Sequence, residues 1–190
     1  GSDTTLKKVL DRGFRSIVVP MVNSVEQARG IAASCRYPVR GTGGVGRGYA
    51  APIVRGSDYG TRPDYAVRTA NEDMLLFVQC ETRESIDALP GICAVEGVDG
   101  IFLGPNDLAA TLGNMEQMEH ATPQAAFAEV ERAVTGAGAL LATVCGGGRD
   151  WADLRARGFT LVAGVNDVSF LIGAACDAAA VRDEQLADLA

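Results

Sequence analysis

The stretch "LLFVQCETRESIDALPGICAVEGVDGIFLGPNDLAATLG", residues 75–113, contains two short apolar runs, and an acidic residue follows each of them. Glu81 follows "LLFVQC", and Asp107 follows "GIFLGPN". A helical pattern over residues 83–90 separates the two runs. Short apolar runs that alternate with helical patterns are typical of βαβ units, and near-continuous apolarity is typical of parallel strands buried on both faces. The stretch therefore predicts an α/β fold with a parallel sheet.

The same alternation extends over the rest of the chain. Candidate strands are residues 16–22, 37–44 (the weakest), 75–81, 100–104, 139–145 and 159–165. Candidate helices are residues 4–12, 24–34, 64–70, 83–90, 123–136, 150–157 and 168–179. No linker or low-complexity segment divides the chain, so we expect a single domain over residues 1–190.

The length of the chain limits the choice of architecture. A closed barrel of eight strand–helix units typically needs about 250 residues. With 190 residues, this chain is short by about two units. The pattern predicts either an open, doubly wound sheet or a barrel that lacks two units.

The composition excludes several classes of partner. The net charge is −7 and no Lys/Arg block occurs, so we expect neither nucleic acid nor an anionic membrane surface as a partner. No apolar run approaches the roughly 20 residues of a bilayer span, and the first residues lack a signal-peptide pattern. The five cysteines include no CxxC spacing, which predicts reduced thiols in the cytoplasm. We expect Cys80 and Cys145, which end apolar runs, to be structural rather than reactive.

Other motifs give weaker signals. The single histidine, His120, precedes a predicted helix, which indicates a surface or capping position. Because the chain has one histidine, a His-rich metal site is excluded, and a Ser-His-Asp triad is excluded unless His120 is its base. The segment "RGTGGVGRG" (40–48) lacks the Lys-Ser/Thr of a phosphate-binding P-loop, which favours a turn with positive φ. The segment "CGGGRD" (145–150) joins a strand to a helix, so its amides either face an anion or form a flexible loop.

The two acids have both a chemical and a structural interpretation. The carboxyl ends of parallel strands meet at one edge of a sheet, where ligands bind, so Glu81 and Asp107 are expected to lie side by side. Two carboxylates without histidine suit a hard cation, Mg²⁺ or Mn²⁺. Alternatively, Asp107 is the N-cap of a helix "DLAATLG", and Glu81 is an acid in the first turn of the helix at "TRESIDAL".

Three segments, "VVPMVNSVEQAR", "VQCETRESIDALPGICAVEGVDGIFLGPNDLAATLG" and "AGVNDVSFL", closely resemble the HpcH/HpaI family. The resemblance covers about Leu6 to Ala180 and depends most on the spacing of V-Q-x-E-T and G-P-x-D-L. Members of this family are metal-dependent (class II) pyruvate aldolases of hydroxy-oxo acids with a TIM-barrel fold. The resemblance thus implies a TIM-type (β/α) barrel that lacks the first two βα units.

The resemblance also implies a site. Glu81 and Asp107 would be the protein ligands of the divalent metal ion, Mg²⁺ or Mn²⁺, which would act as a Lewis acid that stabilises the pyruvate enolate. The partners would be a pyruvate-like ketoacid, an aldehyde and further copies of the chain in a homo-oligomer. Four residues would bind the ketoacid: Gln79 would contact it, and the backbone of Gly104, Pro105 and Asn106 would hold its carboxylate.

The chain departs from the family pattern at its catalytic groups. The catalytic arginine and histidine of the family precede the position that corresponds to Asp3, so this chain contains neither. Gly43 occupies the arginine position of the family loop G-x-R-G-x-G, and Asp11 matches an acid associated with the family histidine.

Several readings of these departures are open. The chain is a shortened aldolase, a diverged aldolase with other catalytic groups, or an impaired homologue that serves as a metal- or ketoacid-binding or assembly subunit. A citrate-lyase-like acyl lyase is a further alternative. In each case an open barrel edge is an aggregation hazard, so we expect a partner subunit or a rearranged segment to cover it.

Overall fold

The computed structural model describes residues 3–38, 46–146 and 148–187. At its centre lies a five-stranded sheet whose strands are all parallel and whose order follows the chain. The strands are β1 (Ser16–Val19), β2 (Leu75–Cys80), β3 (Gly100–Leu103), β4 (Leu140–Val144) and β5 (Leu161–Ala163).

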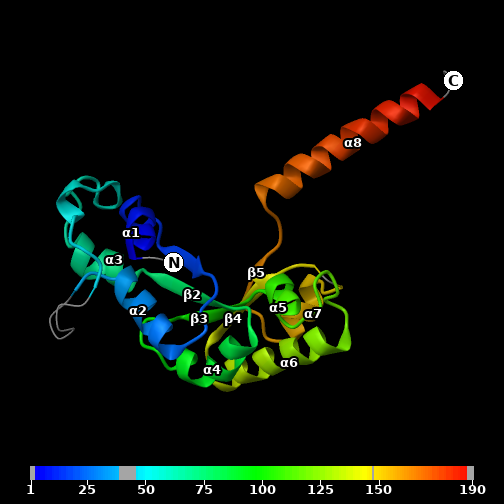
Figure 1. Ribbon diagram of the computed structural model, residues 1–190. Coiled ribbons are helices and arrows are strands. Elements are labelled where there is room, and N and C mark those ends of the chain that lie inside the picture. The colour runs from blue at the N-terminus through cyan, green and yellow to red at the C-terminus, as the bar shows by residue number, and fades with distance from the viewer. Residues whose placement is uncertain (1–2, 39–45, 147, 188–190) are drawn as a thin grey trace.

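Helices connect the strands and cover one face of the sheet (Figure 1). They are α1 (Asp3–Asp11), α2 (Val25–Cys35), α3 (Ala70–Glu72), α4 (Arg83–Cys93), α5 (Pro105–Thr111), α6 (Ala121–Gly136), α7 (Trp151–Ala156) and α8 (Asp167–Ala187). The helices α1, α2, α4 and α6 pack in this order, each against the next. Two short 3-10 helices, η1 (Ala51–Ile53) and η2 (Arg55–Ser57), and a π-helix, η3 (Tyr65–Thr69), lie between α2 and α3.

The two faces of the sheet carry separate apolar clusters. Side chains that point toward the helices, such as Leu76, Val78 and Leu103, belong to the main core. The alternate residues point to the opposite face, where Phe77 and Phe102 form a smaller cluster with Ala142. Because both faces are apolar, the strands read as continuous apolar runs in the sequence.

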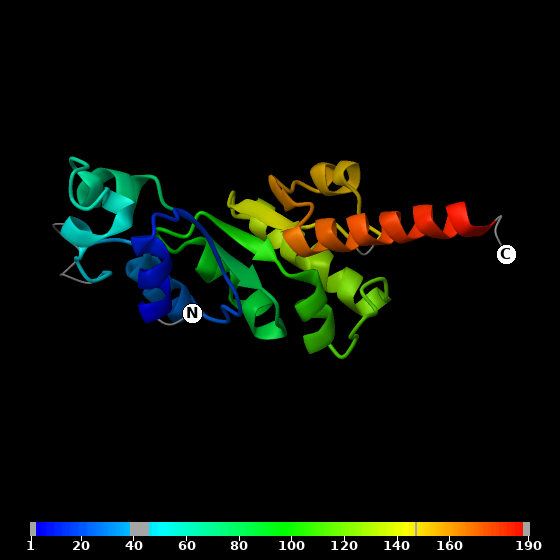
Figure 2. The same ribbon diagram turned by 90° about the horizontal axis from the view of Figure 1, so that it is seen from above.

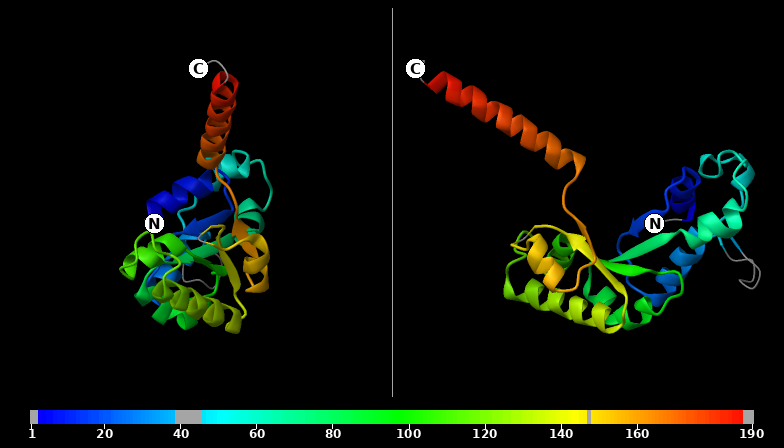
Figure 3. Two further views of the ribbon diagram at one scale, coloured as in Figure 1. Left: turned by 90° about the vertical axis from the view of Figure 1, so that its right-hand side faces the viewer. Right: turned by 180° about the vertical axis from the view of Figure 1, so that it is seen from behind.

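Strand order and layering distinguish the two predicted architectures. A doubly wound sheet reverses its strand order and carries helices on both faces. Here the order β1 to β5 is continuous and the main helices lie on one face, as in part of a barrel (Figure 3). The doubly wound alternative is therefore wrong. The prediction of a TIM-type barrel is confirmed only in part, because the described strands form an open half-barrel.

Several predicted elements differ from the observed ones. Within the weak strand 37–44, residues 37 and 38 are not in a strand, and residues 39–45, with Gly43, lie outside the described residues. The predicted helix 64–70 is the π-helix η3 followed by α3. The predicted helix 168–179 is much longer, since α8 runs over Asp167–Ala187.

Helix α8 projects away from the sheet and its covering helices (Figures 1 and 2). None of its residues is buried. It nevertheless carries large apolar side chains, including Phe170, Leu171 and Ile172, which are 57–72% exposed. Among the described residues, no helix combines the length and apolarity that a bilayer span requires.

Candidate metal centre

Glu81 lies directly after β2, and only Thr82 separates it from α4. The N-cap of α4 is Thr82, which forms a capping box with Ser85. Glu81 therefore lies outside the helix, and its interpretation as an acid of the first helical turn is wrong. By strand alternation its side chain follows Phe77 and Gln79 on the face of the sheet away from the helices. The residue is only 2% exposed.

Hydrogen bonds to both its carboxylate and its backbone hold Glu81 in place, and one of them runs from the Glu81 N–H to the Ser85 hydroxyl over 3.1 Å. The backbone N–H of Met21, just beyond β1, donates to Oε2 over 2.8 Å. The side-chain amide of Gln79 donates to Oε1 over 2.7 Å. The hydroxyl of Thr111, in the last turn of α5, donates to the Glu81 backbone carbonyl over 2.7 Å. Groups near β1 and on β2 thus orient the carboxylate, while Thr111 beyond β3 holds the backbone of Glu81.

Asp107 lies in the first turn of α5, one strand away from Glu81. The N-cap of this helix is Gly104, and Pro105 occupies its first position, where a missing N–H has no cost. Asp107 is therefore the third helical residue, and its interpretation as the N-cap is wrong. The charge of Asp107 helps to raise the pKa of Glu81, which places the two carboxylates within interaction distance. The fold thus brings together the two acids that the sequence singled out.

Burial is the main cause that raises the pKa of Glu81 above its ordinary value. The Met21 amide opposes this shift, whereas the charge of Asp107 adds to it. A buried carboxylate beside a second carboxylate is unfavourable without a cation, and a divalent ion would relieve both effects. No cluster of three or more His, Cys, Asp or Glu side chains occurs within the described parts of the chain. The pair therefore fits a Mg²⁺- or Mn²⁺-type ion whose other ligands are water or substrate oxygens.

Gly104 provides the space for the Glu81 side chain. A Cβ added at Gly104 would lie 2.5 Å from Glu81 Oε1 and 2.7 Å from its Cγ. The backbone of Gly104 has φ −90° and ψ 91°, which residues other than glycine adopt readily. Glycine is thus required here by the proximity of Glu81 and not by the backbone conformation.

Gly104→Ala is expected to weaken Mn²⁺ binding roughly ten- to hundredfold, because overpacking that costs about 1–3 kcal/mol must displace the Glu81 carboxylate. Isothermal titration calorimetry with Mn²⁺ measures the change. Gly30→Ala is the matched control, since a Cβ at this position in α2 meets nothing within 4 Å. Equal affinities of Gly104→Ala and wild type would contradict the prediction.

The predicted ketoacid-binding residues lie next to the two acids, Gln79 beside Glu81 and the other three at the start of α5 before Asp107. The amide of Gln79 is held by Glu81, and Gly104 and Pro105 are buried at the start of α5. Asn106 is exposed beside Asp107. Their contacts with a substrate stay a prediction.

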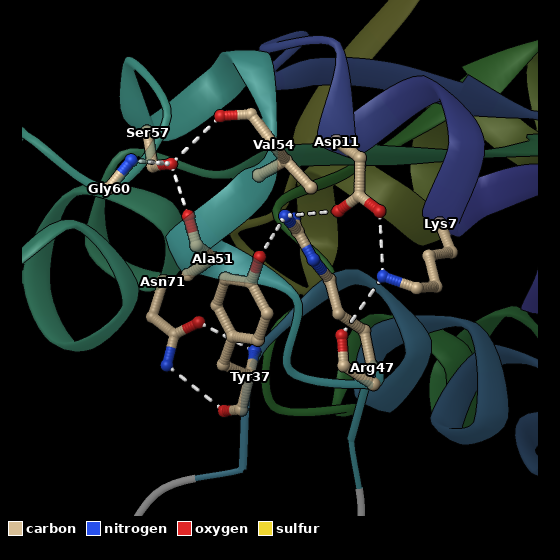
Figure 4. Close-up of polar contacts among 10 residues, drawn as sticks. Lys7, Asp11, Tyr37, Arg47, Ala51, Val54, Ser57, Gly60 and Asn71 are labelled. Atoms are coloured by element: carbon tan, nitrogen blue, oxygen red, sulfur yellow. Dashed lines mark hydrogen bonds and ion pairs between the residues drawn. The ribbon is translucent and has the colours of Figure 1, made fainter.

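Other candidates lie elsewhere. His120 is the N-cap of α6, and its Nδ1 accepts a hydrogen bond from the Thr122 N–H, which confirms the predicted capping role. Asp11 ends α1 and accepts hydrogen bonds from Lys7 and Arg47, and Arg47 also donates to the Tyr37 hydroxyl (Figure 4). Because α1 precedes β1, this cluster lies at the amino end of the strands, away from Glu81. Asp11 therefore stabilises the packing of α1 against the segment that carries Arg47.

The two cysteines at strand ends differ in exposure. Cys80 is 2% exposed, and burial raises the pKa of its thiol to about 12, so its thiol is structural as predicted. Cys145 is only partly buried, and its low reactivity stays a prediction.

Comparison with known proteins identifies relatives of the whole chain. Residues 1–174 match the family described as HpcH/HpaI aldolase/citrate lyase. A hydroxypyruvate/pyruvate aldolase of Cupriavidus necator is 38% identical over 191 aligned positions, which cover 99% of this chain and 68% of the relative. A 4-hydroxy-2-oxo-heptane-1,7-dioate aldolase of Klebsiella pneumoniae is 41% identical over 133 positions, which cover 70% of this chain and 48% of the relative.

The structural comparison agrees with these matches. A crystal structure of an HpcH/HpaI aldolase/citrate lyase family protein from Burkholderia cenocepacia superposes with a TM-score of 0.86 at 32% identity. The match covers 95% of this chain and 70% of that protein. The chain thus spans about half to two thirds of the length of the curated relatives that it matches.

Proposed function

The chain belongs to the HpcH/HpaI aldolase/citrate lyase family, and on this premise we propose that it is a divalent-metal-dependent aldolase of the pyruvate type. The proposed substrates are 4-hydroxy-2-oxo acids, which it would cleave to pyruvate and an aldehyde or form from them. The observation that carries the proposal is the juxtaposition of Glu81 and Asp107 at the carboxyl ends of neighbouring strands. The names of the relatives, hydroxypyruvate/pyruvate aldolase and 4-hydroxy-2-oxo-heptane-1,7-dioate aldolase, support this substrate class.

Each side chain has a definite task in this proposal. Glu81 and Asp107 would hold the divalent ion, Mg²⁺ or Mn²⁺. When bound, the ion supplies Lewis acidity toward the carboxylate and keto oxygens of pyruvate. Gln79 orients Glu81 and faces the ketoacid, while the backbone from Gly104 to Asn106 lies beside its carboxylate. The apolar cluster of Phe77, Phe102 and Ala142 on the same face of the sheet keeps water from the strand side of the site.

Two titrations test the proposal. Mn²⁺ is titrated into the chain by calorimetry, and pyruvate release from a 4-hydroxy-2-oxo acid is then measured with saturating Mn²⁺ and with excess chelator. We expect one bound ion per chain and a chelator-sensitive release of pyruvate. The absence of Mn²⁺ binding would contradict the proposed centre.

An impaired homologue is the second candidate function. A chain that binds a metal and a ketoacid without efficient turnover would act as a binding or assembly subunit. A citrate-lyase-like acyl lyase is a third alternative, and acetyl transfer from a citrate-type substrate in place of pyruvate release would favour it.

We further propose that the chain is one domain, acts in the cytoplasm and assembles as a homo-oligomer. The five unpaired cysteines support a reducing compartment. The exposed apolar residues of α8 and the unpaired outer edges of β1 and β5, within the described strands, support assembly.

A further inference from the structure

Met21 has an unusual backbone conformation beside the proposed metal centre. It follows Pro20 at the end of β1, and its φ is 56°, in the left-handed region. Residues other than glycine, asparagine and aspartate rarely adopt this region, because it costs about 1–2 kcal/mol. The side chain does not account for this conformation, because it is 48% exposed.

The backbone on either side of Met21 is restricted in other ways. The ring of Pro20 fixes its φ and leaves it without an N–H to donate. The Val22 N–H donates to the Gln79 carbonyl over 3.3 Å. The Val22 side chain is 1% exposed in the core. Between these two residues, the left-handed turn directs the Met21 N–H to Glu81 Oε2 over 2.8 Å. The strain thus coincides with a contact to a proposed metal ligand.

This contact differs in kind from the other hydrogen bond of the carboxylate. The donor to Oε1 is the side-chain amide of Gln79, which can rotate. The donor to Oε2 belongs to the main chain, so its direction depends only on the backbone dihedral angles. Because the Met21 N–H comes from the end of β1, it also fixes Glu81 relative to a second strand.

We propose that Met21 is a positioning residue of the metal centre, whose left-handed backbone holds the Glu81 carboxylate in the orientation that, with Asp107, binds the divalent ion. The inference rests on the proposed function of this pair. It assigns the requirement at position 21 to the backbone. Residues that tolerate positive φ should therefore keep the affinity for the ion, and β-branched residues should weaken it.

Variants at position 21 separate the backbone from the side chain. Met21→Asn keeps the N–H and tolerates positive φ, whereas Met21→Val keeps the N–H and is strongly disfavoured there. We expect Met21→Val to weaken Mn²⁺ binding about tenfold, which corresponds to about 1.4 kcal/mol. We expect Met21→Asn to bind Mn²⁺ with an affinity within about twofold of wild type. Calorimetry measures both affinities. Circular dichroism checks that each variant is folded.

A second site controls for backbone strain in general. Glu116 also has a positive φ, 60°, and lies on an exposed loop after α5. Glu116→Val should therefore leave Mn²⁺ affinity unchanged. Equal affinities of Met21→Val and wild type would overturn the inference, and so would equal weakening by Met21→Val and Met21→Asn. Failure of wild type itself to bind Mn²⁺ would instead overturn the proposed function on which the inference rests.

Discussion

Glu81→Gln and Asp107→Asn are each expected to weaken Mn²⁺ binding by more than about 100-fold. Mutations of residues that only support a metal ligand typically cost 10–100-fold in affinity, so the loss of one of two carboxylate ligands should exceed this range. Within the described residues no third acid, histidine or cysteine joins the pair and could compensate. Calorimetry on the two variants and wild type measures the effect, and binding by either variant with wild-type affinity would refute the two-carboxylate centre.

The stability of the metal-free protein shows whether the weaker Mn²⁺ binding of Glu81→Gln comes from the site itself or from a destabilised fold. Burial raises the pKa of Glu81, so the folded state holds this proton more tightly than the unfolded state does. Stability is therefore lost as pH rises from the ordinary value of 4.5 through the raised pKa, and the neutral Glu81→Gln variant avoids this loss. Without metal, Glu81→Gln should resist urea unfolding better than wild type near neutral pH, with an advantage that disappears below about pH 4. A variant that is less stable at neutral pH would indicate a structural role for the carboxylate.

The sequence predicted the positions of the strands better than the closure of the sheet. Short apolar runs separated by helical patterns identify parallel strands, because strands buried on both faces must be apolar throughout. Whether the sheet closes depends on the number of strands and on their pairing partners, which a local pattern does not contain. For the same reason, the sequence pattern allowed both a doubly wound sheet and a partial barrel.

The two acids were identified from the sequence, but their local roles were not. The "GP" at residues 104 and 105 contains a signal that could have been used, since proline favours the first helical position and so excludes Asp107 from the N-cap. Likewise, Thr82 and Ser85 form the capping box that excludes Glu81 from α4. In contrast, the roles of Met21 and Gly104 depend on tertiary proximity to Glu81, because neither has a sequence signal of its own.

The length of α8 was also underestimated from the sequence. Its residues beyond position 179 contain charged side chains and no apolar periodicity that would indicate a helix face. None of its residues is buried within the described chain, so packing against the sheet does not explain its apolar side chains. These exposed apolar side chains support the proposed assembly of the chain with further copies.

Turnover by this chain is expected to be several orders of magnitude below that of a longer family member, although metal binding persists. The resemblance implies a catalytic arginine and histidine at positions that precede Asp3, and His120, the single histidine, caps α6. The loss of one preorganised donor costs about 10²–10³ in rate, and the loss of a general acid–base costs about 10²–10⁴. The two losses need not add fully, because groups that act together are not independent.

The measurement is steady-state pyruvate release from a 4-hydroxy-2-oxo acid at saturating Mn²⁺, with the hydroxypyruvate/pyruvate aldolase of Cupriavidus necator as the comparator. Mn²⁺ affinity is measured in parallel, because it depends on Glu81 and Asp107, which this chain contains. Weak turnover with intact metal binding would support the impaired homologue, since the acids at the strand ends would then hold the ion without groups that move protons. Turnover equal to that of the comparator would require another residue of the chain, or a residue of a second copy, to supply the missing cation and base. Because α8 exposes its apolar residues, and the outer edges of β1 and β5 are unpaired within the described strands, a second copy would then be the first place to locate these groups.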